Sequence, residues 1–267
     1  MTLLLDGATR LHFIVGDPIA QVKSPGGVSQ MLQDGGHNAL VVPAHVAPAD
    51  LAAFVQGATL TRNVDGIIVT VPHKIAMTAQ CASLSDRAAF LGAVNTLRRN
   101  ADGTWHGDMF DGLGYVAALE EKGVSLAGRS VLLAGAGGAG SAIAHALVEA
   151  GVARLAIHEQ DHARRDALIA RLARLGKADV QAGSPDPAGF DIAINATPTG
   201  MRASDPLPFD IASLSAAHIV GDVITQPLVT PLIEAARARG CLTVIGTDMF
   251  AKVRDLMVAY LLAHPAG

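Results

Sequence analysis

The stretch SVLLAGAGGAGSAIAHAL, residues 130–147, combines an apolar run, three spaced glycines and a helical pattern. The apolar run at 130–134 indicates a buried strand, and Gly135, Gly137 and Gly140 then form the pattern G-x-G-x-x-G. In this context the glycines permit a tight turn, close approach of a pyrophosphate and packing of helix on strand. The helix N-terminus adds free N–H groups and a positive dipole end. We predict a dinucleotide site at Gly135, Ala136, Gly137, Gly138, Ala139 and Gly140.

The alternative is that these glycines serve only the turn and its packing. Glu159 argues for the dinucleotide, because it follows the next apolar strand and lies about 20 positions after Gly140, as expected of a ribose-binding acid. A carboxylate there accepts hydrogen bonds from ribose hydroxyls and repels a 2′-phosphate. The nearest cations, Arg164 and Arg165, lie inside the next predicted helix rather than beside Glu159. We therefore expect NAD rather than NADP. The alternative is that Glu159 is only an exposed residue at the end of its strand and that Asp161 caps the following helix.

Composition limits the other possible functions. The chain has 267 residues, enough for two modest domains, and its 50% hydrophobic and 16% charged residues predict a folded protein. The net charge of −4, without a basic cluster, argues against nucleic acid as a partner. Cys81 and Cys241 are too few for a disulfide framework or a cysteine metal site. His158 and His162 alone show ligand spacing, and they straddle a strand end and a helix start, so no metal is expected.

The amino-terminal leucines are too few for a signal peptide, and charged residues interrupt the long apolar stretch after residue 130. We expect a cytoplasmic protein that has no membrane partner. Short apolar runs alternate with helical patterns along the chain. The predicted strands are residues 11–16, 39–43, 66–71, 93–97, 130–134, 154–158, 191–195, 219–223 and 242–245. The predicted helices are residues 24–33, 48–56, 73–81, 115–122, 141–150, 163–175, 231–239 and 249–263.

This alternation predicts an α/β protein whose parallel strands carry ligands at their carboxyl ends. We place a domain seam near residues 107–114, with the dinucleotide domain at 111–246. The Pro- and Gly-rich segments 183–189 and 204–210 are predicted as surface loops.

Several motifs, in order, resemble those of the shikimate/quinate dehydrogenase family over nearly the whole chain. They are Pro18-Ile19 with Ser24-Pro25, TVPHK at 70–74, GAVNT at 92–96, GDMFDG at 107–112, the glycine turn, NATPTGM at 195–201 and TPL at 230–232. The resemblance implies an N-terminal substrate domain with a mixed, mostly parallel sheet. It implies that residues 1–110 form this substrate domain and that residues 111–246 form a doubly wound Rossmann domain for the nicotinamide cofactor. The last helix, in residues 247–267, is then expected to pack back on the first domain.

The resemblance further implies that Lys74 and Asp111 are the catalytic pair. A lysine desolvated in a cleft can accept the hydroxyl proton of a secondary alcohol, while a carboxylate orients it. The alternatives are that Lys74 is a surface lysine and that Asp111 only caps a helix. The implied substrate-binding residues are Ser24, Thr70, Asn95 and Gln226, and the implied further cofactor-binding residues are Thr197, Pro198, Met201, Val223 and Gly246.

The chain departs from the family where the family has polar substrate contacts. Val22 replaces a serine, and Ile68, Thr225 and Val253 replace Asn, Tyr and Gln. Residues 159–161 read Glu-Gln-Asp in place of the Asn-Arg-Thr associated with NADP. Each buried polar group that loses its partner costs about 1–3 kcal/mol, so we expect weak binding of shikimate and a related acid as substrate. Gln21, Lys23 or Gln226 could otherwise supply the missing contacts.

Three functions compete at this stage. The first is an NAD-dependent dehydrogenase of a shikimate- or quinate-like cyclic hydroxy acid, acting as a monomer or homodimer. A catalytically weak ligand sensor on the same scaffold is the second, although Lys74, Asn95 and Asp111 are retained. A folate-linked dehydrogenase shares the two-domain design but does not predict the TVPHK and GAVNT motifs together.

Overall fold

A computed structural model describes residues 5–20, 22, 24–202 and 204–263. The chain forms two compact units, Met1–Phe110 with Arg254–Gly267, and Asp111–Val253. The sequence analysis placed the whole returning segment, 247–267, with the first unit, whereas residues 247–253 belong to the second. Among the described residues, no helix combines the length and apolar character that a bilayer-spanning segment requires.

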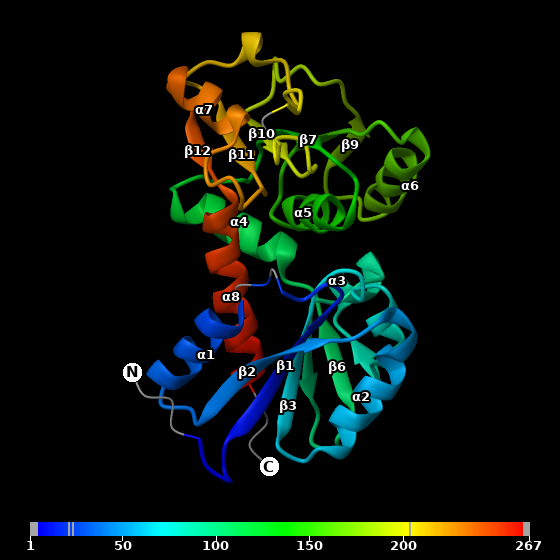
Figure 1. Ribbon diagram of the computed structural model, residues 1–267. Helices are drawn as coiled ribbons and strands as arrows, with labels where there is room; N and C mark the ends of the chain where they lie inside the picture. Colours follow the sequence, from blue (N-terminus) through cyan, green and yellow to red (C-terminus); the bar gives the residue numbers. More distant parts are fainter. Residues whose placement is uncertain (1–4, 21, 23, 203, 264–267) are drawn as a thin grey trace. The chain divides into compact units, whose positions relative to one another are not determined.

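The first unit is built on a mixed six-stranded sheet within the described residues, with the order β2-β1-β3-β5-β6-β4 (Figure 1). Strands β1, β2 and β3 are parallel, and β5 runs antiparallel to both β3 and β6. The strands are β1 (Arg10–Gly16), β2 (Ala39–His45), β3 (Val64–Val69), β4 (Ser83–Leu84), β5 (Thr96–Arg99) and β6 (Trp105–Asp108). The helices are α1 (Ser24–Asp34), α2 (Leu51–Leu60) and α3 (Asp86–Leu91), with 3-10 turns at Pro48–Asp50 and Ala76–Gln80.

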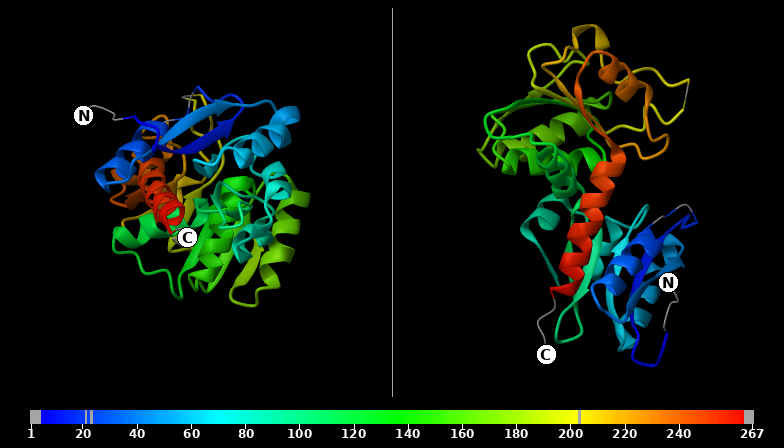
Figure 2. Two further views of the ribbon diagram at one scale, coloured as in Figure 1. Left: turned by 90° about the horizontal axis from the view of Figure 1, so that it is seen from below. Right: turned by 90° about the vertical axis from the view of Figure 1, so that its left-hand side faces the viewer.

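The carboxyl-terminal part of α8 (Gly246–Leu262) packs on this sheet, as the sequence analysis expected. A Cβ atom at Gly66 in β3 would lie 2.3 Å from Leu261, so the sheet accepts the helix there only because the residue is glycine. The phenol of Tyr260 donates a hydrogen bond to the carbonyl of His106 at 2.8 Å. Arg254 lies beside Gly27, which brings α8 next to α1 (Figure 1 and Figure 2).

The predicted helix at 73–81 is wrong, since the segment is a turn followed by the 3-10 turn Ala76–Gln80. Buried His73 contributes to this conformation, because its Nε2 atom lies 2.8 Å from the carbonyl oxygen of Val46. The sequence analysis also missed β4, β6 and α3. Helix α3 is short, beginning where Ser85 accepts a hydrogen bond from Ala88 and ending at Gly92 with a φ of 65°.

The second unit contains a fully parallel sheet of the order β12-β11-β10-β7-β8-β9. Its strands are β7 (Ser130–Ala134), β8 (Arg154–His158), β9 (Asp179–Ala182), β10 (Ile192–Asn195), β11 (Ile219–Asp222) and β12 (Leu242–Val244). Its helices include α4 (Asp111–Glu121), α5 (Gly138–Glu149), α6 (His162–Ala173) and α7 (Pro231–Ala238). This is the doubly wound Rossmann order, which reverses between β7 and β10 and so creates a ligand crevice there.

Helix α4 begins at Asp111, four positions before the predicted start, and packs closely on α5. A Cβ atom at Gly112 would lie 2.0 Å from the carbonyl oxygen of Ala142, which explains why the early helix is glycine-rich rather than apolar. The edge strand β9 was not predicted. Its residues are mostly exposed, so the apolar pattern that marks a buried strand is absent.

Candidate functional site

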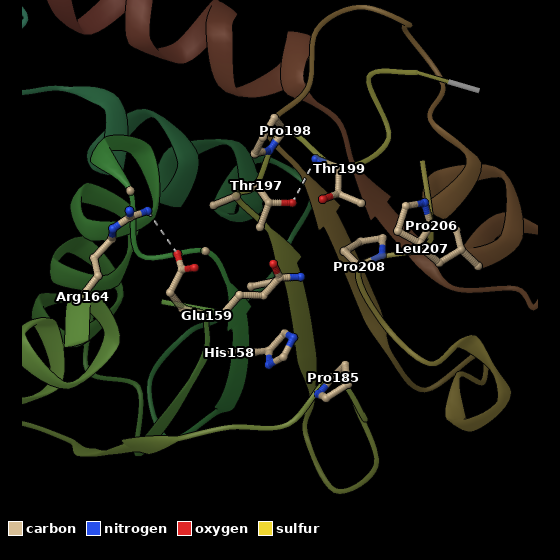
Figure 3. A pocket seen from close by; sticks show the side chains of 15 residues that line it. His158, Glu159, Arg164, Pro185, Thr197, Pro198, Thr199, Pro206, Leu207 and Pro208 are labelled. Atoms are coloured by element: carbon tan, nitrogen blue, oxygen red, sulfur yellow. Dashed lines mark hydrogen bonds and ion pairs between the residues drawn. The ribbon is translucent and has the colours of Figure 1, made fainter. Parts of the chain in front are cut away.

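A cavity of about 460 Å³ lies at the carboxyl ends of the strands in the second unit (Figure 3). It is located at the predicted crevice, because Ala134 ends β7 and Ala196 follows β10. Its walls are formed by Ala134, Gly135, Gly137, His158, Glu159, Gln160, Arg164, Pro185, Ala196, Thr197, Pro198, Thr199, Pro206, Leu207 and Pro208. The glycine turn, the acidic strand end and the loop after β10 therefore line one pocket.

The glycine turn fits a pyrophosphate. Gly135 has a φ of 103°, and Gly140 lies so close to it that a Cβ atom would come within 2.1 Å of the Gly135 carbonyl oxygen. Around Gly137 and Gly138, by contrast, a Cβ atom would meet nothing within 4 Å. The turn thus leaves open space at the N-terminus of α5, where free N–H groups favour an anion.

Glu159 is held at the pocket wall by two backbone donors. The N–H of Ala136 donates to its Oε2 atom and the N–H of Asp161 to its Oε1 atom, both at 3.0 Å. Burial raises the pKa of this carboxyl, but these N–H groups and the Arg164 guanidinium outweigh it and lower the pKa below its usual value. Glu159 therefore presents an ionised carboxylate to the pocket at neutral pH.

The sequence argument that no cation lies beside Glu159 is wrong. The Nη1 atom of Arg164 lies 3.7 Å from Glu159 Oε2 (Figure 3). Its Nη2 atom lies 3.2 Å from Asp161 Oδ2. Arg164 sits in the first turn of α6, and its long side chain reaches back over the end of β8. Asp161 also caps α6 by accepting a hydrogen bond from the Arg164 N–H, as the alternative interpretation expected.

Of the other predicted cofactor-binding residues, Thr197 and Pro198 line the pocket, whereas Met201, Val223 and Gly246 are not part of its wall. Gly246 packs on the backbone after β11, where a Cβ atom would lie 2.5 Å from the Val223 carbonyl oxygen.

The sequence analysis did not predict the other ten wall residues as cofactor-binding. They are Ala134, His158, Gln160, Arg164, Pro185, Ala196, Thr199, Pro206, Leu207 and Pro208. The prolines lie in segments predicted only as surface loops, and no spacing signal places them at this pocket.

In the first unit, the structure brings Thr70, Lys74 and Asn95 to the carboxyl end of β3. The N–H of Val69 donates to the carbonyl of Asn95 at 2.7 Å, and the N–H of Val94 donates to the carbonyl of Lys74 at 2.9 Å. Asn95 is buried, and its Oδ1 atom accepts a hydrogen bond from the N–H of Phe110. Lys74 is partly exposed, so its amine is compatible with a role in proton transfer.

The other predicted residues are distributed over both units. Ser24 begins α1 in the first unit, whereas Asp111 begins α4 and Gln226 is exposed after β11 in the second. Of the departures, Ile68 and Val253 are 2% and 7% exposed, and Val253 packs against Gly114. Gln21 and Lys23 lie outside the described residues. Ile68 and Val253 are therefore packing residues in this structure, and a polar side chain at either would need its own partner.

Comparison with known proteins agrees with this arrangement. Residues 14–97 match a profile described as the shikimate dehydrogenase substrate binding domain. The shikimate dehydrogenase (NADP(+)) of Rubrobacter xylanophilus is 39% identical over 250 residues, covering 92% of this chain and 88% of the relative. The chain belongs to the shikimate/quinate dehydrogenase family. It is thus an oxidoreductase that uses a nicotinamide dinucleotide and a small-molecule substrate.

Two other relatives show how the family varies in cofactor and substrate. The quinate/shikimate dehydrogenase (NAD(+)) of Corynebacterium glutamicum is 38% identical over 207 residues, covering 75% of this chain and 72% of the relative. The crystal structure of ligand-free 5-ketofructose reductase of Gluconobacter sp. strain CHM43 matches with a TM-score of 0.88 and 30% identity, covering 95% of this chain and 93% of that one. Family membership therefore leaves the choice of NAD or NADP, and the substrate, to the residues of this chain.

Proposed function

We propose that this enzyme is an NAD-preferring dehydrogenase of a cyclic hydroxy acid related to shikimate or quinate. The observation that carries the proposal is the Glu159 carboxylate, held on the pocket wall by the N–H groups of Ala136 and Asp161. Its remaining lone pairs are suited to the two hydroxyls of an adenosine ribose, and its charge opposes a 2′-phosphate. The NAD-linked relative from Corynebacterium glutamicum shows that the family includes this cofactor choice.

Arg164 reduces this preference without reversing it. Its guanidinium faces two carboxylates, Glu159 and Asp161, so the cluster keeps a net negative charge. Glu159 is fixed and only 14% exposed at its side chain, whereas Arg164 is 54% exposed. We therefore expect NADP to be used with lower efficiency rather than excluded.

Lys74 and Asp111 are proposed as the groups that handle the substrate hydroxyl. The bound nicotinamide supplies a hydride acceptor for the carbon that carries this hydroxyl. As that carbon is oxidised, the hydroxyl proton must also leave, and the Lys74 amine accepts it. Asp111 orients the hydroxyl and favours the protonated amine once it forms. Asn95 and Thr70 supply neutral hydrogen bonds that fix the ring.

The substrate is proposed to be a related acid that carries fewer or differently placed polar groups than shikimate. Val22 and Thr225 are at least partly exposed positions where the family has Ser and Tyr: the valine side chain has no hydrogen-bonding group, and the threonine hydroxyl is on a much shorter side chain than that of tyrosine. The likeness to a 5-ketofructose reductase supports a scaffold that accepts a different arrangement of polar groups, since that name denotes a keto sugar rather than a carboxylic acid.

A spectrophotometric screen tests the function. Cyclic hydroxy acids, including shikimate and quinate, and neutral polyols are each offered with NAD and with NADP, and reduced cofactor is followed at steady state. We expect turnover with at least one cyclic acid and higher kcat/KM with NAD. Tight nucleotide binding without turnover of any substrate would instead favour the ligand-sensing alternative.

A further inference from the structure

Three buried polar side chains lie next to the cofactor pocket, two at strand ends and one at the start of a helix. Asn195 ends β10 and Asp222 ends β11, and the two residues are direct partners in the parallel register. Thr230 caps the N-terminus of α7. The three residues are 0%, 1% and 1% exposed. Buried polar groups require hydrogen-bond partners, and here the partners come from two loops.

Asp222 binds the loop at residues 223–230. Its Oδ1 atom accepts a hydrogen bond from the N–H of Ile224 at 3.0 Å, and its Oδ2 atom accepts one from the hydroxyl of Thr230 at 2.8 Å. The Asn195 amide donates from Nδ2 to Asp222 Oδ1 at 3.3 Å, which links the two strand ends. Asp222 is therefore the anchor of one loop and of Asn195.

Asn195 binds the loop at residues 196–200, which forms part of the pocket wall. Its Nδ2 atom also donates to the carbonyl of Thr199 at 3.0 Å. Its Oδ1 atom accepts from the N–H of Thr197 at 3.1 Å and from the Thr197 hydroxyl at 2.7 Å. The Thr199 N–H then donates to the Thr197 hydroxyl, so the turn is closed on itself (Figure 3).

The two loops also touch each other. Gly200 has a φ of 110°, and a Cβ atom there would lie 3.5 Å from Ile224 Cδ1 and 3.7 Å from Thr230 Cβ. A displacement of Ile224 or Thr230 is therefore transmitted to the end of the pocket loop. The hydrogen bonds of Asn195 and Asp222 and the approach of Gly200 to Ile224 and Thr230 therefore connect the same two loops, 196–200 and 223–230.

The electrostatic environment makes the cluster sensitive to lost donors. Burial raises the pKa of Asp222, and the donors that oppose this shift include the Ile224 N–H, the Thr230 hydroxyl and the Asn195 amide. The other titratable group nearby is the phenol of Tyr115 from α4, whose pKa is raised by burial and by the charges of Asp222 and Asp248. A carboxylate at residue 195 would keep the donors of Thr197, but it would lose the amide that now donates to Asp222 and would place a second negative charge beside that carboxylate.

We infer that Asn195 and Asp222 are positioning residues that, together with Thr230, hold the 196–200 loop in the conformation that binds the dinucleotide. None of the three needs to touch the cofactor. They act through Thr197 and Thr199, which line the pocket. This inference rests on the dinucleotide site of the proposed function and extends it to the residues that shape its wall.

The test uses Asn195→Asp in the full-length protein, with the Kd for NAD measured by titration calorimetry between pH 5 and pH 8. Two adjoining carboxylates share one proton at low pH, and that proton replaces the lost amide donor. At pH 8 both carboxylates are ionised and repel each other, so residue 195 no longer holds the 196–200 loop in place. We expect near wild-type Kd at pH 5 and a Kd about 10- to 100-fold higher at pH 8, the effect of losing a charge-assisted hydrogen bond. Wild-type Kd should stay nearly constant.

Asn100→Asp is the matched control, because it adds the same charge to the first unit, where the Asn100 amide donates to the hydroxyl of Thr104. It should leave the pH profile unchanged. If Asn195→Asp fails to fold, Thr230→Val and Thr230→Ser replace it: the valine variant should raise the Kd about 10-fold, and the serine variant should restore it.

A pH-independent Kd in folded Asn195→Asp, or equal Kd values for the two Thr230 variants, would overturn the inference alone. Wild-type protein that binds neither NAD nor NADP would overturn the proposed dinucleotide site and the inference with it.

Discussion

The backbone N–H of Ala136 donates a hydrogen bond to Oε2 of Glu159 at 3.0 Å. This hydrogen bond joins the glycine turn after β7 to the acidic residue that follows β8. Two features that dinucleotide recognition uses separately, the phosphate turn and the ribose acceptor, are one connected structure in this enzyme. A change at Glu159 should therefore affect both cofactor choice and the turn.

Replacing Glu159 by alanine should weaken NAD and relax discrimination. The variant loses the ribose acceptor and leaves the Ala136 N–H without its carboxylate, so kcat/KM with NAD should fall about 10- to 100-fold. The value with NADP should fall less or rise, because the opposing charge is gone. Initial rates with both cofactors check this. Equal efficiencies with NAD and NADP in the wild type would mean that Glu159 does not govern the choice.

Arg164→Gln should sharpen the preference for NAD. Without this guanidinium, Glu159 and Asp161 both face a 2′-phosphate unneutralised, so kcat/KM with NADP should drop about 10-fold while NAD changes little. Arg165→Gln is the control, since Arg165 instead pairs with Asp166. A parallel loss with both cofactors would show that Arg164 supports the pocket rather than discriminating between them.

The sequence was sufficient to predict the second unit in most of its elements. Apart from the exposed edge strand β9, its parallel strands are largely apolar, and the glycine turn between β7 and α5 has a fixed pattern, so local signals and tertiary structure coincide there. The first unit was harder to predict because β4 and α3 are short and are defined by contacts. Ser83 in β4, for example, pairs with His106 in β6, which is distant in the sequence.

The candidate site shows the same division. Gly135, Glu159 and Thr197 have positions set by strand ends, and they line one pocket as the motifs indicated. Arg164 reaches that pocket through its long side chain, and Pro206 reaches it because of the conformation of its loop. Neither position is marked by a periodic pattern or a motif in the sequence. Ile68 is 2% exposed, a burial that its sequence position does not reveal, and its replacement of a polar substrate contact stays a prediction.

Lys74→Ala should abolish turnover and leave NAD binding intact, because Lys74 belongs to the first unit and the glycine turn to the second. Loss of a general acid–base group typically lowers kcat by about 10²- to 10⁴-fold. Asp111→Asn should cost somewhat less if Asp111 orients rather than carries the proton. Lys177→Ala, which removes a surface partner of Glu149, is the control. Wild-type kcat in Lys74→Ala would remove this lysine from the mechanism.

Tyr115→Phe should stabilise the protein. The Tyr115 hydroxyl is fully buried and has no hydrogen-bond partner among the described residues, so its removal should raise the free energy of unfolding by about 1 kcal/mol. Urea unfolding at pH 8 measures this. Tyr260→Phe is the opposite control, because that hydroxyl donates to the His106 carbonyl and its loss should destabilise.

The same tyrosine gives a pH dependence of defined sign. Burial raises the pKa of Tyr115 in the folded state, so above the ordinary value of about 10 the unfolded chain loses this proton first. Stability from this group is complete below that pH and is lost as the pH rises further. Unfolding at pH 8 and pH 10.5 should show a smaller alkaline loss in Tyr115→Phe than in the wild type. An equal loss in both would assign the alkaline effect to other groups.

The last prediction concerns the substrate and the residue at position 22. Val22 is partly exposed and stands where the family has a second serine beside Ser24, so shikimate should bind weakly, with a high KM. A buried carboxylate oxygen that lacks a hydrogen-bond donor weakens binding by about 1–3 kcal/mol. A substrate that needs no donor at this position does not lose this binding free energy. Val22→Ser should therefore lower the KM for shikimate about 10-fold and leave the preferred acid less affected. Val253→Gln, which would restore the family's residue at position 253, is expected to destabilise the protein, because Val253 packs on Gly114. A wild-type enzyme with a low KM and a high kcat for shikimate would show that the altered pocket does not exist and that another side chain, such as Gln226, makes the contact.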